Sequence, residues 1–314
     1  MRVVLAPMQG VLDHLMREVL TSINDYDLCI SEFIRVVDQL LPEKVFYRLC
    51  PELKQGGKTR AGTPVRVQLL GQHPEWLAEN ALRAIELGSP GVDLNFGCPA
   101  PTVNKSKGGA VLLKEPETLY RIVNAVREAV PAHLPVSAKI RLGYEDKALY
   151  MENAHAAWQG GADELAVHAR TKVEGYKAPA HWQYVDDIRR ALPIPVTANG
   201  EIWNHADAIA CARVSGCETL MVGRGALSLP NLADVMKTGC AHLGWGDVLQ
   251  LMVRYTEQDL ASEKADYYPS RIKQWFSYLR REYPAADLLF RDIRVLKETH
   301  PIRDALLHAA QTQI

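Results

Sequence analysis

Short apolar runs alternate with longer amphipathic segments along the first 242 residues of the chain. The short runs have the apolar content and the period of buried strands. The longer segments carry apolar residues at helical spacing, as Leu12, Met16 and Val19 do. The pattern predicts eight strands, over residues 3–8, 26–33, 65–71, 91–96, 135–143, 164–170, 195–201 and 219–222. It predicts helices over residues 11–23, 74–87, 116–130, 147–159, 182–192 and 204–215, with partly helical structure within residues 35–50.

The regular alternation of strand and helix indicates an α/β protein. Eight such units over residues 1–242 favour a (β/α)8 TIM barrel. A doubly wound open sheet is the alternative, but residues 6–10 (APMQG) lack the G-x-G-x-x-G fingerprint expected after its first strand. From residue 243 the strand pattern ceases, and helices are expected over residues 248–264, 271–282, 285–298 and from 302 onward. We therefore expect a catalytic barrel at 1–242 and an all-helical C-terminal domain at 243–314.

Composition and charge exclude several classes of protein. The chain has 314 residues, 47% of them hydrophobic, and a net charge of −1, so any nucleic-acid surface must be local. The six cysteines form no C-x-x-C pair, which argues against a disulfide framework or a zinc site and predicts reduced thiols in the cytoplasm. No apolar run is long enough for a membrane span, and the N-terminal run is too short for a signal peptide. We expect no metal site and no membrane partner.

Polar residues gather at the predicted carboxyl ends of the strands, where a barrel of this kind places its chemistry. Cys98 lies between Gly97 and Pro99 at the end of the fourth strand. Most free cysteines are buried apolar residues, but these neighbours place this one at a loop surface. His168 alone would suggest a core histidine, yet Arg170 follows on the same face of the strand. The other candidates at strand ends are Pro7, Met8, Gln68, Asn95, Lys139, Asn199, Gly200, Glu201, Gly223 and Arg224.

Two glycine turns follow the seventh and eighth strands, where this fold commonly binds a phosphate. Their sequences are NGE at residues 199–201 and GRG at residues 223–225. Glycine lets a phosphate approach the backbone, and Arg224 can neutralise it. Each turn alone is compatible with an ordinary surface turn, whereas the two together favour a phosphate site. Lys139 is either paired with an acid such as Glu201 or available to a ligand, because an unpaired buried charge is costly.

These motifs resemble those of the tRNA-dihydrouridine synthases. The resemblance rests on residues 6–8 (APM), 67–69 (VQL), 93–99 (DLNFGCP), 139–141 (KIR), 168–171 (HART), 198–202 (ANGEI) and 222–226 (VGRGA). Residues 271–280 are similar to the branch of the family that modifies uridine 16 of tRNA, so the resemblance spans nearly the whole chain. Gln9, Phe96 and Ala169 depart from the commoner patterns, and none of the three removes a reacting group.

The resemblance implies an FMN-dependent oxidoreductase that reduces the C5=C6 bond of a uridine in the D-loop of tRNA, acting on a CH–CH bond with NAD(P)+ as acceptor. Because no side chain donates a hydride, a flavin must carry it, and NADPH is expected to reduce that flavin separately. Cys98 is implied as the catalytic acid, which a thiol protonated at neutral pH can be. The implied FMN contacts are Pro7, Met8, Gln68, Lys139, Asn199, Gly200, Glu201, Gly223 and Arg224, and His168 is added as a group that can stabilise charge.

A tRNA substrate requires a protein surface beyond the pocket, because the uridine must leave the RNA fold to react. Residues 271–303 carry eight Lys or Arg against four Asp or Glu, with Trp275 and Tyr278 among them, which suits phosphate contact and stacking. A solvated helix with Trp275 in the core fits this segment equally well. The expected substrate and tRNA contacts are Arg35, Asn95, Arg170, Tyr176, Arg271, Lys273, Gln274 and Arg280. We expect a monomer.

Two other functions remain open on the sequence alone. A flavin barrel that oxidises or reduces a free pyrimidine-like molecule would explain the barrel but not the basic helical segment. A non-catalytic tRNA-binding protein that kept the fold would explain the basic segment but would neither bind flavin nor oxidise NADPH.

Overall fold

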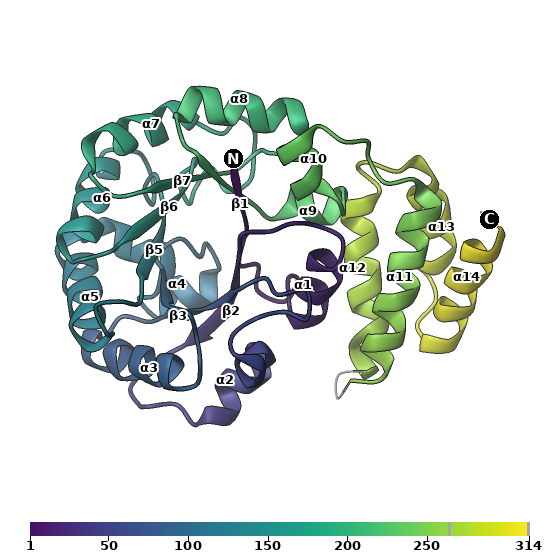
Figure 1. Cartoon of the computed structure of the whole chain (residues 1–314), viewed down its shortest axis with the longest axis horizontal. Helices are drawn as coiled ribbons and strands as arrows, with labels where there is room; N and C mark the ends of the chain where they lie inside the picture. Colours follow the sequence, from purple (N-terminus) through teal and green to yellow (C-terminus); the bar gives the residue numbers. More distant parts are fainter. Residues whose placement is uncertain (263–264, 313–314) are drawn as a thin grey trace.

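Eight parallel strands close into a barrel in sequence order, so that β1 pairs with both β2 and β8. The computed structural model describes residues 1–262 and 265–312 (Figure 1). The strands are β1 (Arg2–Leu5), β2 (Leu28–Arg35), β3 (Val65–Leu70), β4 (Val92–Asn95), β5 (Val136–Arg141), β6 (Glu164–His168), β7 (Val196–Asn199) and β8 (Thr219–Val222). The predicted TIM barrel is confirmed, and the open doubly wound sheet is excluded.

Most helices of the first 242 residues lie around the outside of the barrel (Figure 1). They are α1 (His14–Thr21), α2 (Glu43–Leu49), α3 (Pro74–Glu86), α4 (Pro101–Lys105), α5 (Pro116–Ala129), α6 (Tyr150–Gln159), α7 (Trp182–Ala191), α8 (His205–Ser215), α9 (Arg224–Ser228) and α10 (Leu232–Thr238), with short 3-10 turns η1 (Pro51–Gln55) and η2 (Gly109–Lys114). In α5 the buried residues are Leu119, Ile122, Val123 and Val126, a spacing that forms one apolar stripe facing the strands.

A second group of helices lies to one side of the barrel (Figure 1). It consists of α11 (Trp245–Leu260), η3 (Ala265–Tyr267), α12 (Tyr268–Leu279), α13 (Pro284–Ile293) and α14 (Thr299–Thr312). The group packs on α1 and α9 of the barrel. Trp275 is buried at this contact, where its indole Nε1 donates a hydrogen bond of 3.2 Å to the carbonyl of Leu227. Trp275 is therefore a core residue and not a stacking platform for RNA.

Several elements end earlier or later than the sequence pattern predicts. β6 ends at His168 and β7 at Asn199, two residues short of the prediction in each case. The cause at β7 is the backbone, because Gly200 and Glu201 have φ values of 118° and 59°, which no strand can accommodate. α12 begins at Tyr268, three residues early, with Pro269 in its first turn. Residues 263–264 of the predicted helix 248–264 lie outside the described residues.

The sequence pattern predicts no helix between residues 96 and 116, yet the structure contains one directly after Cys98. Residues 101–105 form the short helix α4, with Pro101 in its first turn. The side-chain amide of Asn104 donates to the carbonyls of Cys98 and Ala100, at 3.0 and 2.8 Å, and holds this turn against the strand end. The cysteine is thus followed by ordered structure.

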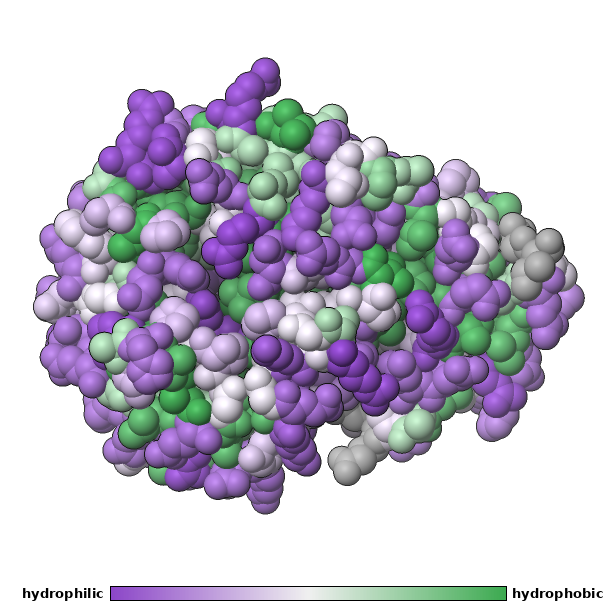
Figure 2. Space-filling view, in the orientation of Figure 1, coloured by the Kyte–Doolittle hydropathy of each residue, from purple (hydrophilic) through white to green (hydrophobic). Residues whose placement is uncertain are grey.

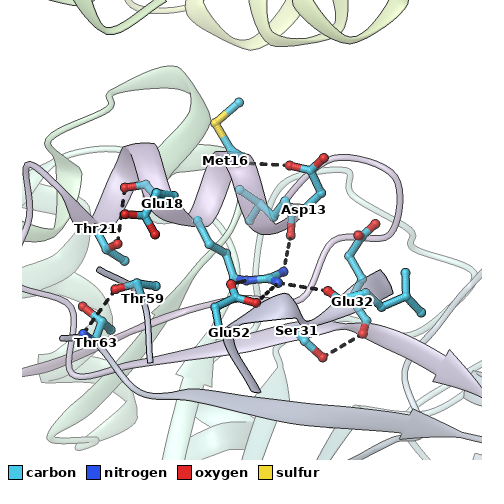
Figure 3. A network of polar contacts seen from close by, with 12 residues as sticks. Asp13, Met16, Glu18, Thr21, Ser31, Glu32, Glu52, Thr59 and Thr63 are labelled. Carbon is cyan, nitrogen blue, oxygen red and sulfur yellow. Dashed lines mark hydrogen bonds and ion pairs between the residues drawn. The ribbon is translucent and has the colours of Figure 1, made fainter. Parts of the chain in front are cut away.

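A buried polar network fixes α1 against η1. Arg17 of α1 is fully buried, and its guanidinium forms an ion pair of 2.8 Å with Glu52 of η1. Figure 3 shows Glu52 below α1, Asp13 at the beginning of that helix, and Glu32 on the neighbouring strand. Asp13 accepts from the Met16 amide at 3.0 Å and so caps α1, and Glu32 accepts at 2.5 Å from the Gly10 amide in the loop after β1. That loop is therefore anchored at Gly10 in its middle and at Asp13 at its end.

Hydrophilic residues cover most of the face seen in Figure 2, with smaller hydrophobic areas between them. Within residues 1–262 and 265–312, no helix has the length and apolar content that a membrane crossing requires.

Candidate active site

A cavity of about 540 Å³ opens at the carboxyl ends of the strands. A volume of this size is ordinary for a cofactor or a drug-sized ligand. The predicted site residues that line it are Pro7, Met8, Gln68, Asn95, Cys98, Lys139, His168, Tyr176, Asn199, Gly200, Glu201, Gly223 and Arg224. Residues far apart in the sequence therefore meet at one place because parallel barrel strands all present the same end.

Cys98 is half-buried and faces this cavity from the turn after β4. Asn95 holds the turn, because its Oδ1 accepts from the backbone amides of Gly97 and Cys98 at 3.0 and 2.9 Å. Gly109 packs behind the cysteine, where an added Cβ would lie only 2.9 Å from the carbonyl oxygen of Cys98. Burial raises the pKa of the Cys98 thiol, although the charges of Arg141 and Lys139 oppose the shift. The thiol is therefore protonated at neutral pH.

Asn95 is an expected substrate contact, and a free side-chain amide offers both a donor and an acceptor. Its Oδ1 already accepts two backbone hydrogen bonds, and one Nδ2 hydrogen is donated to Gln68 at 2.8 Å. The amide therefore retains one Nδ2 hydrogen for a ligand and no free acceptor. A ligand carbonyl fits this remaining group.

Lys139 lies on β5 inside the cavity and is buried. Its ammonium donates to Asn199 Oδ1 at 3.3 Å, and the Asn199 amide donates in turn to the carbonyl of Met221 at 2.8 Å. Burial, followed by the charge of Arg141, lowers the pKa of Lys139 to about 8. Lys139 and Glu201 form no ion pair, so of the two alternatives that the sequence left open, the structure favours a lysine available to a ligand. A buried cation hydrogen-bonded to a neutral amide favours an electron-rich ligand.

The two predicted glycine turns form part of the cavity wall. Gly200 lies against His168, because an added Cβ would approach the imidazole Cδ2 to 2.8 Å. Gly223 lies against Met8 in the same way, with the sulfur 2.8 Å from the position of a Cβ. Both turns therefore require glycine for close packing, and the Arg224 side chain extends over the cavity from the beginning of α9.

His168 and Arg170 lie side by side as expected, with Arg170 Nη1 3.4 Å from His168 Nε2, but their environments differ. Burial lowers the pKa of His168 well below its usual value, with the charge of Arg141 as the second cause, so the imidazole is neutral. It can donate or accept a hydrogen bond but supplies no positive charge. Arg170 is fully buried behind the cavity and forms an ion pair with Glu201. It also donates to the carbonyl of Lys177 at 2.7 Å, so the structure does not expose it to RNA.

The expected RNA contacts outside the cavity divide into two groups. Arg35 and Gln274 are exposed, and so is Arg280, which pairs with Asp287 at 2.5 Å. Arg35 lines a second cavity of about 260 Å³ together with Lys105 and Lys107, and donates to Ser106 Oγ at 2.5 Å.

The other two expected contacts are engaged within the protein. Arg271 forms ion pairs with Asp13 and, at 3.3 Å, with the buried Asp259. Lys273 donates to the carbonyl of Leu296. These two side chains hold the helices together, so the structure does not favour them as free phosphate ligands.

Comparison with known proteins identifies the kind of protein to which this cavity belongs. A family model described as dihydrouridine synthase (Dus) matches residues 4–306. The chain belongs to the dihydrouridine synthase family. The tRNA-dihydrouridine(16) synthase of Shewanella oneidensis is 65% identical to this synthase, over 96% of each chain. The proteins of the same name from Vibrio cholerae and Escherichia coli K12 are 58% and 57% identical, over 99% and 98% of this chain and 98% of each relative.

Solved structures share the barrel of this synthase. Morphinone reductase in complex with tetrahydroNAD superimposes with a TM-score of 0.53 at 13% identity, over 77% of this chain and 88% of that chain. The old yellow enzyme homologue of Zymomonas mobilis gives the same score and identity, over 77% and 90%. At this identity the likeness shows the fold alone. The family match confirms the prediction of a flavin-dependent oxidoreductase that forms dihydrouridine in tRNA.

The synthase has further residues at the cavity that the sequence did not single out. Arg141, Trp203 and Phe33 line it. Tyr278 lines it as well, and the sequence had named it only as an aromatic residue of the basic segment. Arg141 donates to the carbonyls of Gly97, at 2.8 Å, and of Thr171, at 3.1 Å, and so ties the turn beside Cys98 to the loop after β6. The signal was available for Arg141, because it lies two residues after Lys139 on one face of β5.

Cations and aromatic rings alternate along one side of the mouth of this cavity. Arg141 and Arg224 lie over the Tyr176 ring, at 5.3 and 4.7 Å from its centre. Arg224 also lies 5.0 Å from the Trp203 ring, whose other contact is Arg281 of the helical group at 3.7 Å. Tyr176 is 54% exposed, as expected for a residue that can meet substrate. The row connects the barrel with the helices through weak, adaptable contacts.

Proposed function

We propose that this dihydrouridine synthase reduces uridine 16 in the D-loop of tRNA, with FMN as its flavin, NADPH as the reductant and Cys98 as the acid. The observation that carries the proposal is the protonated, half-buried thiol of Cys98 in one cavity with Lys139 and the two glycine turns. The relatives that are 57–65% identical are named for position 16. Their identity extends over the helical group as well as the barrel, which supports the same position here.

The residues present fit a flavin mononucleotide. Lys139 supplies a buried cation beside a neutral amide, and the turns at Gly200 and Gly223 bring backbone into the wall of the cavity. Arg224 extends over the same wall and suits a phosphate. Pro7, Met8, Gln68, Asn199, Glu201 and neutral His168 complete the proposed binding residues. The bound flavin would supply the hydride that reaches C6 of the uracil.

Cys98 then has a single task. As C6 gains the hydride, C5 needs a proton; the S–H bond of Cys98 breaks, the C5–H bond forms, and a thiolate remains. Burial favours this role, because the raised pKa of Cys98 keeps the proton on sulfur until the substrate needs it. Lys139 stabilises negative charge that develops on the ligand. Asn95 offers its remaining Nδ2 hydrogen to a carbonyl of the base.

We further propose that residues 1–242 and 243–314 act as separate catalytic and RNA-binding domains. The exposed Arg35, Gln274 and Arg280 and the half-exposed Tyr176 are the proposed direct contacts. Arg170 and Arg271 are given an indirect role, since their guanidinium groups are held by Glu201 and by Asp13. Their substitution would act on RNA through the wall of the cavity or through the placement of α12.

Mapping dihydrouridine in tRNA tests the reaction and the position together. Cells that lack the relative named for position 16 are supplied with the parent protein or with Cys98→Ala. We expect dihydrouridine to return at position 16 with the parent and not with the variant. Dihydrouridine at another position would overturn the assignment of uridine 16 alone. Purified protein that reduces free uracil as fast as tRNA would instead support a small-molecule dehydrogenase, and a colourless protein that binds tRNA would support a non-catalytic role.

We propose a cytoplasmic monomer. All six cysteines are free, as expected in a reducing compartment. Light scattering on purified protein checks the mass against the 35.0 kDa of one chain.

A further inference from the structure

The interior of the barrel contains a polar layer where apolar side chains usually fill the space. Asp93 of β4 is buried at its centre, two residues before Asn95 on the same face of the strand. Gln68 of β3 and Ser137 of β5 lie beside it in register. Burying a carboxylate in a barrel is costly unless each of its oxygens is satisfied. The proposed mechanism gives Asp93 no task.

The hydrogen bonds of Asp93 fix the orientation of a neighbouring amide. Asp93 Oδ2 accepts from Gln68 Nε2 at 2.6 Å. Burial raises the pKa of Asp93, although the hydrogen bonds from Gln68 and Ser137 and the charges of Arg66 and Lys139 oppose the shift. Because Gln68 presents its nitrogen to this carboxylate, its oxygen faces the opposite side. That oxygen accepts from Asn95 Nδ2 at 2.8 Å. Asn95 must then direct its own oxygen toward the turn, where it accepts from the amides of Gly97 and Cys98.

The other side of Asp93 is anchored as well. Ser137 Oγ donates to Asp93 Oδ1 at 2.5 Å. Arg66 donates to Ser137 Oγ and to Glu164, both at 2.8 Å, so the hydroxyl hydrogen of Ser137 is left to point at Asp93. From both sides, the hydrogen bonds therefore run as donors toward the Asp93 carboxylate.

We propose that Asp93 is a positioning residue: through Gln68 and Asn95 it sets the backbone of the turn that carries Cys98, and so places the thiol for proton transfer. The role rests on the proposed function of Cys98 and deepens it. Displacements of about 1 Å at a reacting group reduce rates by up to about a hundredfold. The dependence is specific, because the step in which NADPH reduces the flavin does not use the Cys98 proton.

The test compares Asp93→Ala with Asp93→Asn in the flavin-loaded protein. Asp93→Ala removes the acceptor, and we expect tRNA-dependent reoxidation of the reduced flavin to slow by at least about tenfold in kcat, with KM for tRNA and the NADPH step within about twofold. Asp93→Asn keeps an oxygen that can accept from Gln68, and we expect it to recover most of the rate. A merely structural role predicts equal losses in both steps and no recovery by asparagine, and either result would overturn the proposal.

Two further measurements keep the proposal testable if Asp93→Ala does not fold or if the proposed reaction is wrong. The first is the rate at which iodoacetamide alkylates Cys98, which requires no tRNA. We expect it to change by at least about threefold in Asp93→Ala and to stay near the parent rate in Asp93→Asn. An unchanged alkylation rate in Asp93→Ala overturns the positioning role whatever the substrate is.

The second measurement is a double substitution. Gln68→Glu places a second carboxylate against that of Asp93. Adding Asp93→Asn in the same chain gives residue 93 an amide that can donate to Glu at position 68, while the other oxygen of that Glu still accepts from Asn95. We expect the double variant to alkylate at a rate nearer the parent than Gln68→Glu does. Additive effects of the two substitutions would contradict the relay.

Discussion

The guanidinium of Arg281 in the helical group lies 3.7 Å from the centre of the Trp203 ring in the barrel. Trp203 in turn donates from Nε1 to Glu201 at 2.9 Å, and Glu201 holds the buried Arg170. One exposed arginine of the helices is thereby linked to the wall of the active-site cavity. Several expected outcomes follow from this arrangement and from the groups around Cys98.

Removing the Arg281 contact should loosen the junction between barrel and helices. For Arg281→Gln we expect a free energy of unfolding that is lower by about 0.5–1 kcal/mol, the usual size of an exposed cation–aromatic contact. Urea unfolding of the variant and the parent measures this difference in the free energy of unfolding. Arg291→Gln is the matched control, because Arg291 is also exposed and contacts Asp287 on its own helix. Equal losses in the two variants would show that the Trp203 contact adds nothing.

Arg271 should behave as a structural residue and not as a simple phosphate contact. Arg271→Ala leaves the carboxylates of Asp13 and fully buried Asp259 without their cation, and we expect a loss of about 2–4 kcal/mol in the free energy of unfolding. Exposed Lys297→Ala serves as the control. Unchanged stability together with weaker tRNA binding would instead restore Arg271 to the RNA surface.

The protonation of Cys98 predicts a pH dependence of the step that uses tRNA. Burial raises the pKa of the thiol, so the acid form persists above its ordinary range near 8.5, and the rate falls only at higher pH. Cys98→Ser should slow this step by about 10²–10⁴-fold without an alkaline fall, since a hydroxyl is a far weaker acid. Rapid mixing of reduced enzyme with tRNA at several pH values measures both. Cys240→Ser, at an exposed thiol, should change neither.

Lys139 predicts a different pH dependence, in the step that reduces the flavin. Its pKa of about 8 means that the ammonium is present at neutral pH and lost as pH rises through that value. We expect flavin reduction by NADPH to fall over the same interval. In Lys139→Arg the fall should disappear, because a guanidinium stays protonated. If the rate of flavin reduction fell over the same pH interval in Lys139→Met, the titrating group would be a residue other than Lys139.

Gly200 should be required for flavin binding. Gly200→Ala adds a Cβ that would lie 2.8 Å from the His168 ring, at a φ of 118°. Gly62→Ala is a matched control, because its φ is 93° and no heavy atom lies within 4 Å of the added carbon. We expect the first variant to purify with little flavin and the second with the parent content, as measured by visible absorbance. A full flavin content in Gly200→Ala would place the cofactor elsewhere.

The sequence predicts the barrel and the position of Cys98 because both depend on local pattern. Strand period and turn residues are properties of short stretches, and the rule that parallel strands share an end then brings distant residues together. The ion pair between Arg271 and Asp13 joins residues separated by 258 positions. The sequence around neither residue indicates which residue it pairs with. The sequence therefore could not separate the basic residues of 271–303 that are exposed from those, such as Arg271, that form ion pairs inside the protein.

Side-chain direction is the other property that the sequence did not supply. Asn95 and Gln68 were recognised as strand-end amides, but their orientation depends on Asp93, which reads as an ordinary polar position in an alternating strand. The same holds for His168, whose neutral state follows from its burial among Arg141, Lys139 and Arg170. The orientation and the protonation of a side chain depend on all the groups around it in the folded protein. Those groups come from distant parts of the sequence, so no short stretch of it contains them.

The closure of the barrel through β1 and β8 has a consequence for how the chain is made. During synthesis, β1 (Arg2–Leu5) can pair with β2 as soon as β2 has been made. Its other edge stays unpaired until β8 (Thr219–Val222) has been synthesised. A chain cut short before residue 219 leaves both β1 and β7 with open edges, which promotes association between chains. The ion pair of Asp13 forms later still, because its partner Arg271 lies further along the chain. The loop that carries Met8 therefore reaches its final conformation only after α12 has been synthesised.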